Sequence, residues 1–510
     1  MNEIRNAAWW LPLAAMLLNA PAQAAVPAAP AVSVTASLKQ LNFSWSRVPE
    51  TTHYDLYFLP RAGGTWVRYA RLPAWRTSVA VNISPHFLHW NEARYVLKAC
   101  NPSGCGSLRP LGVSHLMQQT VGILRPPAEA PYVHMGQAID LSEDGSTLAA
   151  TSRHNLGVGG GGVEVFRKSS SGWKYETRLL GNFEVPLYHP DLAVAVSGNG
   201  NVIALGVETD IPPGAEAEEM TGAVYLFRRT SAGWVREQRL TVEQREDHFG
   251  WRVDLDESGT LLAVWRLLGD PPYQVSGQGV VELFRYSGGS WVRHATLPVL
   301  NERCDALAMS GDGNTVVRSC RRSVEVFTGP TWQRVATLPD EAYSHAEFPA
   351  LNRAMAIAHD GRSFAVRSSG AYDETFIYER VNVYRLGASG WTREASLAPG
   401  EWDPNRYDFG YMGFGRGVAM SRDGRFLAVG NAEDRAAGDG VLYPPIARSG
   451  ELGGAVYVYE RKPWGWILRQ FIKPNTEIPY SFGESVAFAR NGKDLAVSAY
   501  ADLRGSVSLY

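Results

Sequence analysis

Asp423-Gly424-Arg425-Phe426-Leu427-Ala428-Val429, at positions 423–429, is one copy of the pattern that decides the fold. A tight turn that ends in glycine leads into a short apolar strand, and this arrangement occurs seven times from about residue 130 onward. Glycine suits the turn because one residue of a short hairpin loop adopts a left-handed conformation. The seven turn glycines are Gly145, Gly200, Gly259, Gly313, Gly361, Gly424 and Gly492. Self-similarity of this kind predicts a repeat architecture.

Two more strands complete each repeat. A third strand has the pattern Val, any residue, Val or Leu, Phe or Tyr, as in Val456-Tyr457-Val458-Tyr459. In six repeats a fourth strand begins with Trp and reaches an aliphatic residue six positions later, as from Trp466 to Ile472. Four strands per repeat predict an all-β fold, a β-propeller in which each blade buries its faces against its neighbours.

The seventh repeat lacks its fourth strand, because the sequence ends after Val507-Ser508-Leu509-Tyr510. The segment from Met117 to Ile123 precedes the first repeat and has the spacing of a fourth strand. We therefore expect residues 114–510 to form a seven-bladed β-propeller closed by strand 117–123.

The N-terminal residues 1–24 are typical of a secretory signal peptide. Arg5 is followed by an apolar run over 7–18 and by the small-residue pattern Ala22-Gln23-Ala24, which predicts cleavage before Ala25. An uncleaved anchor is the alternative. The apolar run is short for a membrane span, and no later segment approaches roughly 18 uninterrupted apolar residues. We expect an exported chain that is periplasmic, cell-surface or secreted, with no membrane insertion after cleavage.

Residues 25–31 are rich in Ala and Pro and predict a linker, and residues 32–113 show the short alternating strands of an immunoglobulin-like β-sandwich. This stretch resembles a fibronectin type III domain. Trp45 matches the core tryptophan of the second strand of that family, and Tyr95 matches its corner tyrosine. The resemblance implies a spacer or adhesion module whose aromatic residues belong to the core.

The seven repeats resemble FG-GAP repeats, the blades of integrin α-like propellers, and bacterial proteins of this kind are exported. Phe249-Gly250, Phe414-Gly415 and Phe482-Gly483 open three of the repeats. The resemblance implies extracellular adhesion or ligand binding. Calcium-binding members carry a long acidic loop in the first hairpin, whereas the turn here is short, as in Ser310-Gly311-Asp312-Gly313. We expect neither a metal nor another cofactor.

Four cysteines form two candidate disulfides. Cys100 and Cys105 flank a tight turn, and Cys304 and Cys320 lie equally far from the hairpin centre at Asp312. Both pairs could therefore face each other on paired strands, as suits an exported protein. Free buried thiols are the alternative.

Charge and motifs exclude several classes of function. The formal net charge of −2 gives no broad attraction to nucleic acid. The glycine run over 157–162 lacks the Lys and Ser/Thr of a phosphate-binding loop, and neither a zinc-protease motif nor a nucleophile elbow is present.

Long loops gather on one face of the predicted propeller, which we call the loop face, and short hairpins occupy the opposite, hairpin face. The long segments are 207–221, 266–277, 341–352, 368–380, 399–411 and 430–453. Their aromatic residues are candidate ligand-binding residues because large rings supply contact area at low entropic cost. These residues are Trp402, Tyr407, Tyr411, Tyr443, Tyr372 and Tyr273. The alternative is that they pack their own loops.

The sequence therefore predicts a binding or adhesion scaffold without catalytic residues, whose partner is a protein or a glycan. Two alternatives stay open. One is an extracellular polysaccharide lyase or hydrolase with its site at the channel mouth, because propeller enzymes draw residues from several blades. The other is a structural component of a secreted, toxin-like assembly.

Overall fold

The computed structural model describes residues 24–127 except 108, and much of residues 133–510. Within the second range it leaves out 155–160, 171, 181–191, 212–220, 243–247, 269–277, 300–303, 321–322, 340–353, 374–375, 400–412, 436–439, 443–452, 475–480, 490–491 and 501–504. The expected signal peptide falls almost wholly outside the described residues.

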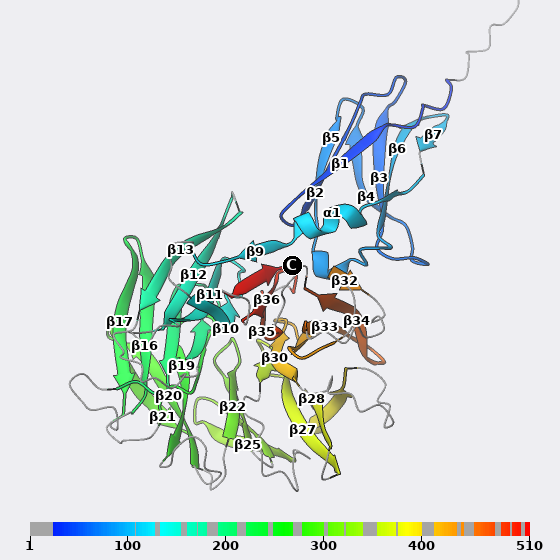
Figure 1. Ribbon diagram of the computed structural model, residues 1–510. Coiled ribbons are helices and arrows are strands. Elements are labelled where there is room, and N and C mark those ends of the chain that lie inside the picture. Colours follow the sequence, from blue (N-terminus) through cyan, green and yellow to red (C-terminus); the bar gives the residue numbers. More distant parts are fainter. Residues whose placement is uncertain are drawn as a thin grey trace, which may run out of the picture.

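The N-terminal module consists of two antiparallel sheets around one core (Figure 1). The first sheet has the order β1 (Val32–Ser37), β2 (Gln40–Trp45), β5 (Ser78–Asn82). The second has the order β4 (Val67–Pro73), β3 (His53–Leu59), β6 (Arg94–Asn101), β7 (Gly104–Ser107), and β8 (Leu111–Gly112) also pairs with β6. Between the sheets, Trp45 packs edge-on against Tyr54 and Phe43 packs against Tyr95, with ring centroids 5.3 and 5.1 Å apart. The short helix η1 (Pro85–Phe87) follows β5.

The rest of the chain folds into a β-propeller built from sheets that follow one another along the chain, and we number these blades in chain order. Blade 1 contains β10 (Val133–Leu141), β11 (Thr147–His154), β12 (Gly162–Ser169) and β13 (Gly172–Leu180). Blade 2 contains β14 (Leu192–Val196), β15 (Val202–Val207), β16 (Ala223–Thr230) and β17 (Gly233–Thr241). Blade 3 contains β18 (Arg252–Leu255), β19 (Leu261–Leu268), β20 (Gln278–Ser287) and β21 (Ser290–Thr296). Blade 4 contains β22 (Cys304–Met309), β23 (Thr315–Cys320), β24 (Ser323–Thr328) and β25 (Gln333–Pro339).

The remaining sheets follow the same strand order. Blade 5 contains β26 (Met355–Ile357), β27 (Ser363–Asp373), β28 (Phe376–Gly387) and β29 (Gly390–Leu397). Blade 6 contains β30 (Phe414–Met420), β31 (Phe426–Asn431), β33 (Ala455–Lys462), β34 (Gly465–Lys473) and, outermost, β32 (Gly440–Leu442). Blade 7 contains β35 (Phe482–Phe488), β36 (Leu495–Ala499), β37 (Ser506–Leu509) and β9 (Gly122–Leu124). The first strand of each blade contacts the first strand of the next, and β35 returns to β10, so the first strands surround a common axis.

The turn between the first two strands has the same geometry in every blade. All seven turn glycines have φ between 65° and 69°, a conformation that a Cβ atom would strain. Successive turns are also joined by backbone hydrogen bonds, such as Asn199 N to Glu257 O at 2.9 Å and His359 N to Arg422 O at 3.0 Å. The turns of blades 1 to 6 therefore form a connected rim on the hairpin face.

Adjacent blades are joined on the loop face by close backbone contacts that require glycine. Gly222, before the third strand of blade 2, forms a parallel bridge with Phe249 at the start of blade 3. A Cβ atom on Gly222 would overlap the backbone of Phe249. Gly454 and Phe482 repeat this joint between blades 6 and 7. The Phe-Gly pairs of the sequence thus lie where one blade meets the next.

Blade 7 is completed by a strand from the other end of the chain, because β9 pairs antiparallel with β37 and places Leu124 opposite Val507. The expected strand over 117–123 is wrong in its extent. The chain forms α1 (Ser114–Met117) and the 3₁₀ helix η2 (Gln118–Thr120), and only Gly122–Leu124 pairs with β37. Helix is favoured because it buries Leu116 and Met117 in the core cluster shared with the N-terminal module.

Two segments that we expected to be loops contain strands. Residues 368–380 continue the β27–β28 ladder, with Ser369 opposite Glu379 and Ala371 opposite Ile377. Within 430–453, β32 pairs with the end of β34 and places Val441 opposite Ile472. The aromatic and aliphatic residues Tyr372, Phe376, Ile377 and Tyr378 favour continued pairing over an irregular loop.

Both expected disulfides are confirmed. Cys100 is bonded to Cys105, and Cys304 is bonded to Cys320 directly across the β22–β23 ladder. No helix among the described residues is long and apolar enough to cross a membrane.

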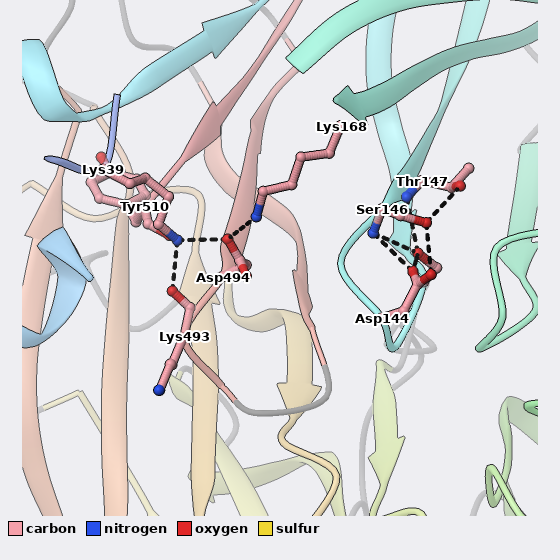
Figure 2. A network of polar contacts seen from close by, with 9 residues as sticks. Lys39, Asp144, Ser146, Thr147, Lys168, Lys493, Asp494 and Tyr510 are labelled. Atoms are coloured by element: carbon pink, nitrogen blue, oxygen red, sulfur yellow. Dashed lines mark hydrogen bonds and ion pairs between the residues drawn. The ribbon is translucent and has the colours of Figure 1, made fainter. Parts of the chain in front are cut away.

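The N-terminal module packs on the hairpin side of blades 6 and 7 (Figure 1). Lys39, in the β1–β2 turn, donates to the backbone oxygens of Lys493 and Tyr510, both at 2.6 Å, and pairs with Asp494 at 2.8 Å (Figure 2). The buried His86 contacts Gly492 O through Nε2 at 2.9 Å, and burial lowers its pKa to about 3, so Nε2–H donates from a neutral ring. These contacts hold the module against the turn that joins β35 and β36.

Candidate functional site

A cavity of about 360 Å³ runs along the axis of the propeller and is lined by the first strands of all the blades. Most of its wall is small or aliphatic, because each first strand contributes residues such as Ala138, Val194 and Ala308. Cavities of this size can hold a small ligand, so the polar groups at its two ends decide what the channel can do.

The hairpin-side end of the channel is bridged by four polar side chains from four different turns: Glu143, Glu257, His359 and Arg422. Arg422 pairs with Glu143, and its Nη1 lies 3.1 Å from Glu257. His359 Nδ1 lies 3.0 Å from Glu143 Oε1. All four side chains are partly buried, which strengthens these interactions relative to surface pairs. We call this set the axial cluster.

The imidazole of His359 lies between the other three members of the axial cluster. Arg422 Nη2 lies 2.8 Å from His359 Nε2, and His359 Nδ1 lies 3.0 Å from Glu143 Oε1. His359 Nε2 also lies 3.5 Å from Glu257 Oε2. Both ring nitrogens therefore have partners within the cluster.

Two glycines make room for the axial cluster. A Cβ atom on Gly311 would overlap both His359 and Glu143, and one on Gly198 would lie 2.8 Å from Glu257 Cγ. The turns of blades 2 and 4 therefore carry glycine where the turns of blades 1, 3, 5 and 6 carry a member of the axial cluster.

The axial cluster includes three groups, Glu143, Glu257 and His359, whose ligand atoms lie close enough together to hold a metal ion. The Arg422 guanidinium already bridges the two carboxylates. A cation bound there would have to displace Arg422, so the arrangement is that of an ion-pair bridge.

Two aspartates, Asp140 in β10 and Asp254 in β18, line the channel. Asp140 Oδ2 accepts a hydrogen bond from Val196 N at 2.6 Å, and Asp254 Oδ2 accepts one from Met309 N at 2.7 Å. Each carboxyl group thereby links its blade to the next. Burial raises the pKa of both carboxyl groups to about 7, because the channel wall solvates the charged form poorly.

Ion pairs also occupy the loop-side end of the channel. Arg416 lies 3.2 Å from Glu484 and 2.7 Å from Glu433, so it ties the first strand of blade 6 to blade 7. Burial raises the pKa of Glu484, and Arg416 opposes that rise. These pairs frame the entrance to the channel from the loop face.

One long loop of this face is anchored at its base by a buried polar group. The Asp210 carboxylate accepts from the Tyr225 hydroxyl at 3.1 Å and pairs with Arg239 at 2.6 Å. The backbone oxygen of Asp210 accepts from Thr221 N and Gly222 N, both at 3.1 Å. The two ends of segment 211–220 are thus held together.

Blade 6 repeats this clasp. Asp434 accepts from the Tyr457 hydroxyl at 2.7 Å and pairs with Lys473 at 3.3 Å, while its backbone oxygen accepts from Gly453 N and Gly454 N. The clasps fix the two ends of segment 211–220 and of segment 435–452, which includes β32, so any ligand contact made by these segments starts from a defined frame.

The sequence-predicted binding residues are not brought together by the described structure. Five of them, Trp402, Tyr407, Tyr411, Tyr443 and Tyr273, lie outside the described residues. Tyr372 lies in β27, and its side chain is outside the described part. These six residues stay a prediction.

Sequence reasoning missed the axial cluster and the clasps, although signals for both are present. Aligning the repeats on the turn glycine puts Glu143, Glu257, His359 and Arg422 at the same position, two residues before it. Tyr225 and Tyr457 replace the glutamate that occupies the same third-strand position in Val163-Glu164-Val165-Phe166. Comparing the repeats column by column would have found both sets.

No family model matches the sequence, and no curated protein matches it. Solved structures that resemble the chain include the Cps50 (Swd1) β-propeller domain of Myceliophteria thermophila, with 11% identity and a TM-score of 0.46, covering 76% of this chain and 99% of that one. Sqt1 of Chaetomium thermophilum, bound to the N-terminus of the ribosomal protein L10, has 15% identity and a TM-score of 0.43, covering 72% and 83%. A protein of unknown function from Desulfotomaculum acetoxidans has 11% identity and a TM-score of 0.34, covering 72% and 95%. The β-propeller assignment rests on the strand pairing described above.

Proposed function

We propose that this protein is an exported bacterial binding scaffold whose propeller recognises a protein or glycan through its loop face. Residues 1–24 act as a signal peptide, 25–31 as a linker and 32–113 as a fibronectin type III-like spacer. Residues 114–510 form a seven-bladed propeller of FG-GAP type. The Phe-Gly pairs at the joints between blades and the two disulfides support this proposal.

The loop face is chosen over the hairpin face as the binding face because the hairpin side of the propeller is already occupied. The axial cluster bridges the channel on the hairpin side, and the N-terminal module packs on that same side over blades 6 and 7. The loop face keeps the channel entrance and two loops with clasped bases. Ligand recognition therefore belongs to the loop face.

The test is a glycan array and a pull-down with the mature chain, followed by Trp402→Ala and Tyr407→Ala. We expect both substitutions to weaken binding of the ligand found by at least about tenfold, as for buried aromatic anchors, and to leave thermal unfolding nearly unchanged. The matched control is Trp464→Ala, because Trp464 is 77% exposed in the β33–β34 hairpin on the opposite face. If Trp402→Ala and Tyr407→Ala bind the ligand as tightly as the control Trp464→Ala, these loop-face residues take no part in binding.

The axial cluster also favours a second candidate, a polysaccharide lyase or hydrolase, because an imidazole, a guanidinium and two carboxylates converge there. The pairing of His359 Nε2 with Arg422 argues for a structural role instead. Assaying reducing-end release from acidic and neutral polysaccharides with the wild-type protein and His359→Ala separates the two. Activity that disappears in His359→Ala would establish the enzyme.

A further inference from the structure

The N-terminal module carries an exposed edge strand with large apolar side chains. β4 is the terminal strand of its sheet and pairs with β3 along one side. Val67 is 56% exposed and Tyr69 is 45% exposed. Among the described residues nothing pairs with the other side of β4, and edge strands with exposed apolar side chains are prone to pair with another chain.

Two tryptophans flank this strand. Trp66, directly before β4, is 38% exposed, and Trp75, just after it, is 66% exposed. The Arg76 guanidinium lies 5.0 Å from the centre of the Trp75 ring, so this exposed ring already stacks with a cation. Residues 66–76, which we call the aromatic edge, thus combine apolar area with unpaired backbone.

The aromatic edge carries a surplus of positive charge. No acidic residue occurs between Asp55 and Glu92, whereas this stretch contains Arg61, Arg68, Arg71 and Arg76. Asp55 forms two hydrogen bonds with Arg71, at 2.8 and 2.9 Å, and lies 3.9 Å from Arg68. One carboxylate therefore faces several guanidinium groups, and the edge is complementary to an acidic partner.

We propose that the aromatic edge is a docking site for an extended acidic segment of a partner protein, which adds a strand beside β4. Open backbone N–H and C=O groups favour a polypeptide over an acidic polysaccharide, because another backbone can complete the ladder. The contacts by which Lys39, His86 and Phe87 attach the module to the propeller involve no residue of the aromatic edge. This site is separate from the loop face.

The probe is a synthetic peptide of alternating Glu and Val, about twelve residues long, which is enough to span β4 at about 3.3 Å per residue. We expect it to bind the full mature chain, to bind more weakly as salt rises from about 50 to about 200 mM, and to quench tryptophan fluorescence. A Lys–Val peptide of equal length should not bind. Binding of polygalacturonate without binding of the Glu–Val peptide, or binding of neither, overturns the proposal.

Variants locate the contact. Arg68→Glu combined with Arg76→Glu should lower the affinity for the Glu–Val peptide by at least about tenfold. Arg47→Glu makes the same charge change at an exposed site elsewhere in the module and should have little effect. Trp75→Ala removes a ring that is 66% exposed, and it should weaken binding and abolish most of the fluorescence change. Unchanged affinity in the double variant or in Trp75→Ala, or full affinity of a peptide N-methylated at every second residue, would refute strand addition at this edge.

Discussion

Burial in the channel wall changes the acid–base chemistry of Asp140 and Asp254. Burial is the main reason that the pKa values of both carboxyl groups rise to about 7. The negative charge of Glu143 also raises the pKa of Asp140, and the charges of Asp140 and Asp256 raise that of Asp254. The unfolded chain keeps these groups near their ordinary pKa of about 4. Between about pH 4 and 7 the folded state therefore binds more protons than the unfolded state, so their contribution to stability is lost as the pH rises through this window.

We expect Asp140→Ala combined with Asp254→Ala to make the free energy of unfolding depend less on pH between about 4 and 7. Alanine is the matched replacement because the equivalent position in the other blades holds Ala195, Ala308, Ala356, Ala419 and Ala487. Urea unfolding of both proteins at several pH values measures the two slopes. The double substitution also removes the hydrogen bonds that Val196 N and Met309 N donate. This loss lowers the free energy of unfolding by the same amount at every pH, so it does not change the slope. Parallel slopes would show that neither carboxyl group titrates in this window.

The axial cluster needs a residue without a side chain at position 311, because His359 and Glu143 occupy the space that a Cβ atom would fill. Gly311→Ala should lower the free energy of unfolding by roughly 1–3 kcal/mol, because the added methyl group overlaps His359 and Glu143. The control is Gly387→Ala, where the nearest atom to a new Cβ is Gly390 O at 3.8 Å. Chemical denaturation of both variants tests this, and an equal effect of the two would show that the turn at Gly311 relaxes freely.

Among the elements, the two disulfide-linked hairpins should differ in their contribution to stability. The Cys304–Cys320 bond closes a loop with a sequence separation of 16, and Cys100–Cys105 closes one of 5. Loop-closure entropy predicts contributions of about 3 and about 2 kcal/mol respectively. Paired Cys→Ala variants compared by urea unfolding should therefore show the larger loss in blade 4, which also loses buried sulfur contacts. A larger loss for Cys100–Cys105 would point to strain or unfolded-state structure instead.

The sequence was informative about elements where local chemistry determines them. The turn glycines, the strand that contains Val456 and the pairing of Cys304 with Cys320 all follow from patterns within one hairpin. It failed where packing by distant residues decides, as at Met117, which is helical because it is buried in the core cluster shared with the module. The hairpin over 368–380 was missed because loop length alone was used to assign it.

At the scale of the whole molecule, the site depends on contacts that no local pattern predicts. Glu143 and Arg422 are 279 residues apart and meet on the propeller axis, and Lys39 and Asp494 are 455 residues apart and join the module to blade 7. Burial lowers the pKa of Lys39, while Asp494 opposes that shift, as is typical of a cation drawn into an interface to satisfy carbonyl groups. Only the aligned turn positions of the seven repeats give a partial signal for the axial cluster.

Closure of the ring by β9 makes the whole propeller depend on three residues from outside its repeats, because Gly122, Ile123 and Leu124 cover the open edge of β37. A chain that begins at Arg125 leaves β37 as an exposed edge and uncovers Val507 and Leu509, which are buried in the complete protein. We expect this chain to have a lower melting temperature and to aggregate more than a chain that begins at Ser114. The longer chain is the matched control, since both lack the N-terminal module and the Lys39 contact, and only the longer one keeps β9. Scanning calorimetry measures the melting temperature of each chain, and light scattering measures its aggregation. Identical values for the two chains would mean that blade 7 is stable with three strands and that β9 is not needed to close the ring.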